Sequence, residues 1–504
     1  MKRRDFIKTS AITASLPFWL QACNTSLWRD SFPIEVHSDH KAGHLMMQSR
    51  AWNSSANEIK TETIIVGGGV AGVAAASQLK GKDFLLFELS DKLGGTSRSG
   101  SFEGISFAQG AHYELAYPEY YGEEVLGLLE SLGIIQYESW KKMWSFVDKQ
   151  HLIPHGRRQQ CFENGKMRGD VIPKGYDKTR FHEILQDYKG TMALPTRLIA
   201  QEYRYLNDLT FVNFLSEKMI VDEQLKRQMS YHMLDDYGGT ADQVSALAGI
   251  HYFMCRPYTD MAVDLFSPPQ GNAYFVNKML GRVQTDRIRK DHLVKKINKT
   301  PDGYEVEVLD IAKQEVCQVS CENLIYAGQK HALKYIFPEE SELFKNDYAP
   351  WMVVSFIANG IAGEYGFWQN EYLSERQDFL GFIDSSVQDQ SVLKGKRILT
   401  AYYCLRPEDR EYLTTIPDNK ERIANETLGF IEEMLDQKLD VASAFINVMG
   451  HAMPIPKPGY LFNDATTKSQ NGVVYAGVDN GRLPLIYEAL DSGILAARNF
   501  EIKT

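Results

Sequence analysis

A glycine-rich turn between an apolar run and an alanine-rich stretch constrains the fold of this chain more than any other feature. Residues 61–79 read TETIIVGGGVAGVAAASQL. The apolar run predicts a β-strand, the glycines a tight turn, and the alanine-rich stretch a helix. Gly67 and Gly69 permit the turn and let the backbone approach a pyrophosphate, while Gly72 lets the helix pack close to the strand. The first turn of the helix offers unpaired backbone amides to the phosphates.

The acidic residue after the next apolar run supports a dinucleotide site. Residues 84–87 are apolar and lead to Glu88, roughly twenty residues after Gly67. A carboxylate at this distance typically accepts hydrogen bonds from the ribose hydroxyls of an adenosine. Its charge would repel a 2′-phosphate, so NADP is disfavoured. Because strand, turn, helix and acidic strand end agree, we expect dinucleotide binding rather than a purely structural glycine turn.

Two further segments favour FAD over NAD. Residues 91–98 read DKLGGTSR, and residues 472–498 read GVVYAGVDNGRLPLIYEALDSGILAAR. The first resembles the second glycine pair of FAD-dependent amine oxidases and phytoene desaturases, and the second resembles the closing flavin segment of that superfamily. The resemblance covers nearly all of the chain from about Thr61. It implies an α/β fold, in which a FAD-binding Rossmann-like domain of the GR2 type is interleaved with an α+β substrate domain.

The resemblance also implies which residues contact FAD. Residues 104–113 (GISFAQGAHY) resemble the segment beneath the isoalloxazine ring, and the strand at 292–297 resembles the one that places a backbone group against adenine. Asp479 is expected to hydrogen-bond the ribityl or phosphate side of the flavin. The positive N-terminal end of the following helix is expected to stabilise negative charge on the reduced ring. The expected cofactor residues are Gly67, Gly69, Val70, Ala71, Gly72, Glu88, Gly94, Gly95, Thr96, Ala111, His112, Val294, Gly477, Asp479 and Ala489.

The 504 residues are enough to bury a large core, and the patterns divide the chain into two interleaved domains. The expected segments are a signal peptide at 1–23, a tether at 24–60, an FAD domain formed by 61–118, 271–328 and 446–504, and a substrate domain formed by a mainly helical part at 119–270 and a sheet at 329–445.

The N-terminus carries a predicted export signal. Residues 2–8 (KRRDFIK) closely resemble a twin-arginine signal, and residues 20–23 (LQAC) resemble a lipoprotein signal-peptidase site. The apolar stretch at 11–20 is too short to span a membrane. The resemblance implies the twin-arginine translocase as a partner and a periplasmic location, with a lipid anchor at Cys23 left open. The alternative is a basic N-terminus beside a chance apolar run.

Composition excludes other classes of function. The net charge of −10 provides no general basic field, so nucleic acid is not an expected partner. No Cys-x-x-Cys pair is present, so we expect neither a metal site nor a disulfide framework.

Candidate catalytic residues occur in three places. Residues 231–256 contain Asp235 and Asp236, which could hold a cationic amine, and His251, which could accept a proton. The alternative for this segment is helix capping, with the acidic pair before a glycine turn and Asp242 at the start of the next helix.

The other two places are separate segments. His112 is expected to face the flavin ring or the substrate, and His451 with Tyr460 is expected on the substrate side of the flavin, where an aromatic wall would sandwich an amine. For both histidines, a purely structural hydrogen-bonding role stays open.

These residues predict an exported FAD-dependent oxidoreductase that accepts a hydride equivalent from the CH–NH bond of an amine such as a polyamine. Oxygen and a quinone-type acceptor both stay open for reoxidation. No lysine occurs between Lys345 and Lys394, where many amine oxidases carry one that holds a water near the flavin. A desaturase or isomerase acting on an apolar substrate, and a non-catalytic FAD-binding accessory protein, therefore stay open.

Overall fold

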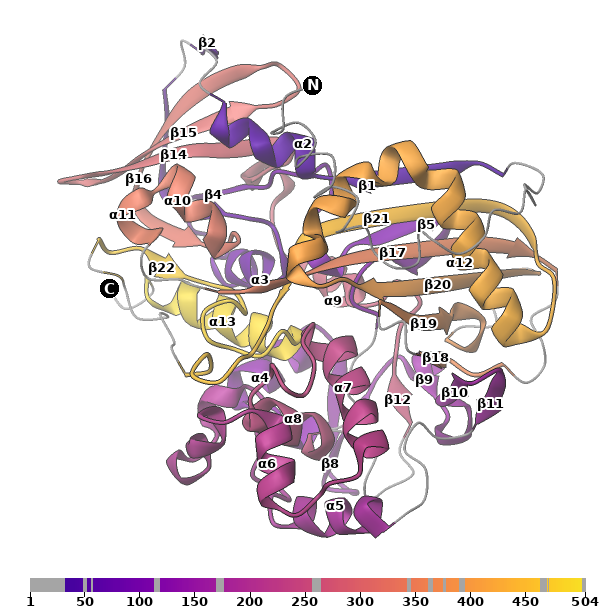
Figure 1. The fold of residues 1–504 in the computed structure, drawn as a ribbon. Helices are drawn as coiled ribbons and strands as arrows, with labels where there is room; N and C mark the ends of the chain where they lie inside the picture. Colours follow the sequence, from indigo (N-terminus) through magenta and orange to yellow (C-terminus); the bar gives the residue numbers. More distant parts are fainter. Residues whose placement is uncertain are drawn as a thin grey trace, which may run out of the picture.

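The computed structural model describes residues 32–48, 52–55, 58–112, 118–168, 176–255, 264–341, 346–360, 366–374, 378–388, 395–462, 469 and 471–500. The predicted signal peptide and Cys23 lie outside these residues. Figure 1 shows two sheets side by side, with a group of helices packed below them.

The first sheet is built on the predicted strand, turn and helix. Strand β3 (Ile59–Val66) is followed by helix α3 (Val70–Gln78) and strand β4 (Phe84–Phe87). The strand order is β13 (Ile288–Arg289), β4, β3, β16 (Glu315–Tyr326), β15 (Gly303–Asp310), β14 (His292–Thr300), with β2 (Asn53–Ser54) and β22 (Val474–Tyr475) also paired to β16. Strands β13, β4, β3, β16 and β22 are parallel, whereas β14, β15 and β16 are antiparallel to their neighbours in the β14–β15–β16 meander.

Close helix packing covers one face of this sheet. Helices α3, α9 (Ala273–Leu280) and α13 (Ile486–Arg498) share one apolar core with β3 and β4. A Cβ on Gly493 of α13 would lie 2.2 Å from the carbonyl oxygen of Ala71 in α3, so only glycine allows this approach. Two short helices, α10 (Leu333–Ile336) and α11 (Pro338–Ser341), follow β16, and α10 packs on the opposite face.

The second sheet is mixed. Its order is β1 (Ile34–Ser38), β21 (Asp440–Pro454), β17 (Tyr348–Asn359), β20 (Lys396–Cys404), β19 (Phe379–Asp384), β18 (Gln369–Leu373), β10 (Gln159–Glu163) and β11 (Lys166–Arg168). Alternate residues of β17 face opposite cores: Met352 and Val354 pack with helix α12 (Lys420–Leu435), whereas Trp351 and Val353 pack with the helical region. The strand is buried on both faces.

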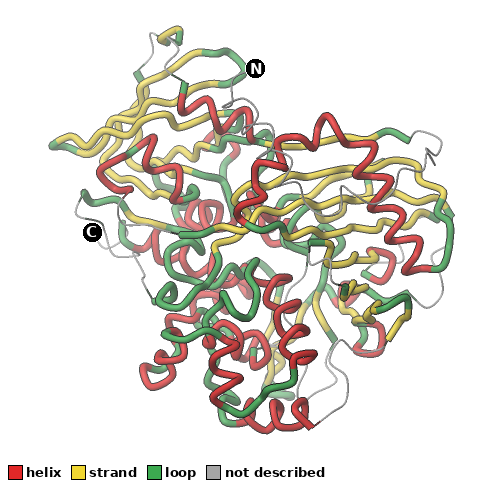
Figure 2. The backbone as a smooth tube through the Cα atoms, in the orientation of Figure 1, coloured by secondary structure: helices red, strands yellow, loops and turns green. Residues whose placement is uncertain are grey.

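The helical region lies between residues 119 and 255 and forms the lower part of the molecule (Figure 2). Its helices are α4 (Glu123–Ser131), α5 (Tyr176–Gln186), α6 (Phe211–Glu217), α7 (Glu223–Tyr237) and α8 (Ala246–Met254). Other elements include α2 (His40–Gly43), the 3-10 helices η2 (His44–Met47), η10 (Lys330–Ala332) and η12 (Pro407–Asn419), and strands β5 (Ser99–Phe102), β6 (Ile105–Ala108), β7 (Ile135–Glu138), β8 (Met143–Phe146), β9 (Leu152–Ile153) and β12 (Leu265–Phe266).

Three predicted boundaries are wrong. Residues 24–60 are not simply a tether, because β1 pairs in parallel with β21 and becomes the edge strand of the second sheet. The boundary at 446 cuts through β21, which stays paired with β17 as far as Pro454 and so belongs to the substrate sheet. The substrate sheet does not begin at 329, because α10 still packs on the first sheet. Strand pairing between distant segments decided the first two boundaries, and the packing of α10 decided the third.

No helix in the described part of the chain is long and apolar enough to cross a membrane.

Candidate cofactor and substrate site

One large cavity lies where the two sheets and the helical region meet. Its volume is about 960 Å³, near the upper end of the roughly 300–1,000 Å³ of typical ligand pockets. Val66, Phe87 and Tyr326, at the carboxyl ends of three adjacent parallel strands, all line it. This is the edge at which open α/β sheets bind their ligands.

The glycine turn at residues 67–69 lines this cavity, and we call it the glycine cradle. Gly67 has a φ of +99°, and a Cβ there would lie 2.8 Å from the carbonyl oxygen of Ala327. Gly69 lines the cavity, and a Cβ there would meet nothing within 4 Å. Helix α3 starts directly after Gly69 without a side-chain cap, so its first amides face a space that a phosphate can fill.

The second glycine pair docks directly on this turn. The amide of Gly94 donates to the carbonyl of Gly68 at 2.8 Å, and Gly95 has a φ of +57° with its would-be Cβ 3.3 Å from the Cα of Gly69. Gly94, Gly95 and Thr96 line the cavity. Gly72 does not line it and serves packing, since a Cβ there would lie 2.0 Å from the carbonyl oxygen of Gly67.

Glu88 lies at the end of β4, buried and facing the cavity. Its Oε2 accepts the amide proton of Gly68 at 2.6 Å, and its Oε1 accepts that of Ser90 at 2.8 Å. Burial raises the pKa of this carboxyl, and the two backbone bonds partly oppose the rise. Each carboxylate oxygen can accept a second hydrogen bond, so Glu88 keeps the capacity to bind a ribose hydroxyl. Val294 on β14 lines the same end.

Residues 110–112 form another part of the cavity wall. The amide of Ala111 donates to the carbonyl of Thr96 at 3.0 Å, and a Cβ on Gly110 would lie 1.9 Å from that same carbonyl oxygen. His112 is buried, with its ring centroid 4.5 Å from that of Tyr402. Ala111 and His112 both line the cavity.

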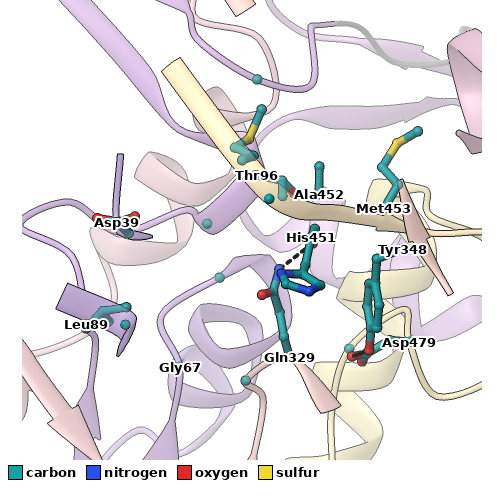
Figure 3. Close-up of a pocket in the computed structure, with 18 of the residues that line it drawn as sticks. Asp39, Gly67, Leu89, Thr96, Gln329, Tyr348, His451, Ala452, Met453 and Asp479 are labelled. Carbon is teal, nitrogen blue, oxygen red and sulfur yellow. Dashed lines mark hydrogen bonds between the residues drawn. The ribbon is translucent and has the colours of Figure 1, made fainter. Parts of the chain in front are cut away.

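The C-terminal segment completes the cofactor end. Gly477, Asp479 and Ala489 line the cavity, as does Ile486 at the start of α13, whose N-terminus carries no side-chain cap. The Asp479 carboxylate already accepts a hydrogen bond from the Tyr348 hydroxyl (Figure 3) and one from the Lys330 amide, both at 2.9 Å. Asp479 therefore anchors the loop between β22 and α13 and also faces the cavity.

Several buried polar atoms that line the cavity have no hydrogen-bond partner within the described part of the chain. They are Asn272 Oδ1, His331 Nδ1, Trp351 Nε1, Tyr402 OH and Asn447 Oδ1. Buried polar groups in proteins are almost always paired, so this cluster indicates a polar ligand. Together with the glycine cradle and the open helix N-termini, these groups fit a dinucleotide such as FAD.

The two carboxylates of α7 face the same cavity from the helical region. Asp235 accepts a hydrogen bond from Gln369 Nε2 at 3.1 Å, and Asp236 is buried. Capping does not account for this pair: Gly238 ends α7 in the left-handed conformation, and Ser245, not Asp242, caps α8. Two carboxylates at a helix C-terminus, where the dipole is also negative, make a cation-binding surface.

His451 lies on β21 and lines the cavity beside His331, and its carbonyl accepts a hydrogen bond from Gln329 Nε2 at 2.5 Å (Figure 3). Burial and the neighbouring histidine lower the pKa of His451 to about 3. Such a weak base is poorly matched to proton abstraction near neutral pH.

Two other candidates do not line the cavity. The Tyr460 hydroxyl donates to the carbonyl of Val478 at 2.8 Å, so it steadies the loop before Asp479 rather than walling the substrate. His251 is fully buried, with its ring near the carbonyl of Ala193 and the sulfur of Cys255. Its role is structural. The aromatic walls are Tyr348, Trp351 and Tyr402 instead. Tyr348 and Trp351 both line the cavity although they are three residues apart, because the register of β17 against β21 shifts between Ala349 and Trp351.

Sequence reasoning missed the N-terminal segment. Asp39, His40 and His44 line the cavity although they precede the glycine turn. Polar residues before the first strand read as a linker, and no local pattern indicated pairing with β21.

Residues 65–132 match the model of a protein family that is described as an NAD(P)-binding Rossmann-like domain. The comparison with curated proteins found no match.

Several solved structures have a similar fold, and their alignments with this chain extend over most of its length. Putrescine oxidase bound to putrescine has a TM-score of 0.61 at 12% identity, covering 89% of this chain and 100% of that chain. Cyclohexylamine oxidase from Brevibacterium oxydans IH-35A has a TM-score of 0.60 at 15% identity, covering 88% and 99%. A fatty acid isomerase from P. acnes that produces CLA has a TM-score of 0.62 at 15% identity, also covering 88% and 99%. The predicted fold class is confirmed, and so is the resemblance to this superfamily at the level of fold.

Proposed function

We propose that this chain, which shares the fold of the FAD-dependent amine oxidase and phytoene desaturase superfamily, is an exported FAD-dependent oxidoreductase that oxidises the CH–NH bond of a cationic amine. The observation that carries the proposal is that Asp235 and Asp236 line the same cavity as the glycine cradle. A cation-binding surface and a dinucleotide-binding surface then share one cavity.

The cofactor end is assigned to the glycine turn, the second glycine pair, Glu88 and the open end of α13. FAD, when bound there, supplies the two-electron acceptor for the hydride equivalent of the substrate carbon. The backbone amides at the start of α3 bind phosphate, and Glu88 accepts from the ribose. The dipole of α13 favours negative charge at the end of the cavity that Ile486 lines.

The substrate end is assigned to the carboxylates and the aromatic rings. Asp235 and Asp236 would hold a second, protonated nitrogen of the substrate, which favours a diamine or polyamine. Trp351 and Tyr402, whose ring centroids lie 6.1 Å apart in an edge-to-face arrangement, would together form one aromatic wall against which the alkyl part of the substrate packs. Their unpaired Nε1 and hydroxyl groups can hydrogen-bond the substrate or an ordered water.

The reacting amine must lose a proton before or during hydride transfer. Of the two predicted histidines, His112 is the better acceptor, because burial lowers the pKa of His451 to about 3. His112 is buried beside Tyr402 and lines the cavity. An ordered water held by Tyr402 is the other candidate.

Export by the twin-arginine translocase, a lipid anchor at Cys23, and oxygen or a quinone as the electron acceptor complete the proposal. The support for export is the N-terminal motif alone. Changing Arg3 and Arg4 to lysine should retain the protein in the cytoplasm, and changing Cys23 to alanine should release an anchored protein into the soluble periplasmic fraction.

A second candidate is an isomerase or desaturase of an apolar substrate. It is favoured by the missing lysine in the substrate sheet and by the fold shared with a fatty acid isomerase. The two carboxylates argue against it, because an apolar substrate would bring no positive charge to Asp235 and Asp236 at the cavity wall.

Anaerobic flavin bleaching tests the proposal. The yellow protein is mixed with monoamines, diamines, polyamines, amino acids and unsaturated fatty acids while absorbance of the oxidised flavin is followed. We expect diamines or polyamines to bleach the flavin. In the Asp235→Asn/Asp236→Asn variant, the amine concentration for half-maximal bleaching should rise at least tenfold, and in the Asp242→Asn control it should not change. Bound FAD that no amine reduces would overturn the amine proposal.

A further inference from the structure

The segment upstream of the glycine turn crosses from one sheet to the other along the cavity. At its start, β1 is the edge strand of the second sheet, and α12 also holds it, since Lys420 Nζ donates to the carbonyl of Ile34 at 3.1 Å. At its end, η2 contacts β14 and α10 of the first sheet. We call residues 38–47, which join these two attachments, the strap.

The strap lines the end of the cavity where Glu88 and Val294 lie. Asp39, His40, His44 and Met46 all line the cavity, and so do Glu88 and Val294. A Cβ on Gly43 would be 3.6 Å from Leu89, the residue after Glu88. Figure 3 shows Asp39 next to Leu89, on the side of the cavity away from Tyr348 and Asp479. The strap therefore covers the ribose and adenine end.

Two contacts hold the strap down. The first is Arg98, which is 5% exposed and lines the cavity: its guanidinium lies 3.5 Å from the Asp39 carboxylate, contacts the His37 ring, and donates to Ser90 Oγ at 2.7 Å. The second is Met46, which packs on the apolar core of the first sheet. One attachment is ionic and the other is apolar.

We propose that the strap is part of the FAD site: it closes over the adenosine half of the cofactor and limits the rate at which FAD leaves. This inference rests on the proposed FAD cofactor but not on an amine substrate. The strap precedes the glycine turn in the chain, so a lid at this end is built from a segment that is separate from the Rossmann unit itself. Bound FAD would fill the space between the strap and Glu88, and release would require the strap to detach.

Release of FAD from the holoprotein tests the role of the two contacts. Flavin fluorescence is followed after dilution into buffer with a trap for free flavin. We expect the Asp39→Ala/Met46→Ala variant to release FAD at least tenfold faster than the unmodified protein. Two controls should release it at the unmodified rate: Asp91→Ala, because Asp91 pairs with Arg98 at 3.6 Å from outside the strap, and Lys41→Ala, because Lys41 is an exposed strap residue.

An unchanged rate of FAD release in the double variant overturns the inference. A protein that binds no FAD contradicts the proposed cofactor instead, and a protein that binds FAD but is not reduced by amines contradicts only the proposed substrate.

Discussion

The imidazole rings of His331 and His451 stack face to face, with centroids 3.7 Å apart and planes 16° apart. The two residues come from different domains: His331 follows β16 of the first sheet, and His451 lies on β21 of the second. Burial lowers the pKa of His331 to about 4 and that of His451 to about 3. The interface between the sheets therefore contains two neutral imidazoles near pH 7.

Acid should weaken this interface. Below the ordinary histidine pKa of about 6.5, the unfolded chain binds protons that the folded chain does not, so stability falls as pH falls from about 6.5 towards 4. We expect the melting temperature to drop between pH 7 and 4.5 and the His331→Gln/His451→Gln variant to have a flatter profile. The exposed His155→Gln control should keep the original slope, and an unchanged slope in the double variant would contradict this account.

Two glycines of the same turn should respond oppositely to alanine. A Cβ on Gly69 meets nothing within 4 Å and enters the cavity, whereas one on Gly72 would lie 2.0 Å from the Gly67 carbonyl oxygen. Gly69→Ala should leave the melting temperature within a few degrees of the original but reduce the bound flavin. Gly72→Ala should destabilise the fold, by about 1–3 kcal/mol or more. Denaturant unfolding and the ratio of flavin to protein distinguish the two effects.

Glu88 should be needed for cofactor affinity. Replacing it with glutamine puts an NH₂ group against the amide of either Gly68 or Ser90, which both donate to the carboxylate. A bound ribose hydroxyl would also lose its charged acceptor, which costs about 1.5–3 kcal/mol, so FAD affinity should fall about tenfold or more. Titration of FAD into the stripped protein measures this. Glu62→Gln, an exposed change on β3, is the matched control.

Arg482 should be critical for stability. Its side chain is 2% exposed, and it donates to Asp491 at 2.7 Å and to Glu488 at 3.3 Å, both fully buried on α13. Arg482→Met removes a positive partner from both carboxylates, although Asp491 keeps Arg197 at 2.8 Å, and should cost about 3–5 kcal/mol in urea unfolding. Arg498→Met removes a half-exposed ion pair with Glu124 and should cost less than about 1 kcal/mol. Equal losses would contradict the role of burial.

The parts of the site that sequence predicted are those fixed by short segments. The turn at Gly67 to Gly72 and the position of Glu88 depend on backbone conformation and strand length within a few residues. Asp235 and Asp236 also line the cavity together, but this placement depends on how α7 packs and not on the local pattern alone.

The parts that sequence mispredicted depend on distant partners. Tyr460 is an aromatic residue near the closing flavin segment, but its hydroxyl is taken by Val478. His251 looked available in a polar segment, yet helix α8 is buried on all sides. A side chain's exposure to a cavity is set by what packs around its element, which local patterns do not contain.

The sequence by itself determined the strand–turn–helix unit, the use of a second glycine pair and a closing helix, and so the class of fold, because each of these rests on local backbone geometry. Only the tertiary structure decided that residues 34–38 join the second sheet, that the strap lines the cavity, and that His331 stacks on His451. Those contacts join segments that lie far apart in the sequence, as in the pairing of Ile34 with Ala444. Their free energy comes from burial and pairing that exist only once both partners are in place.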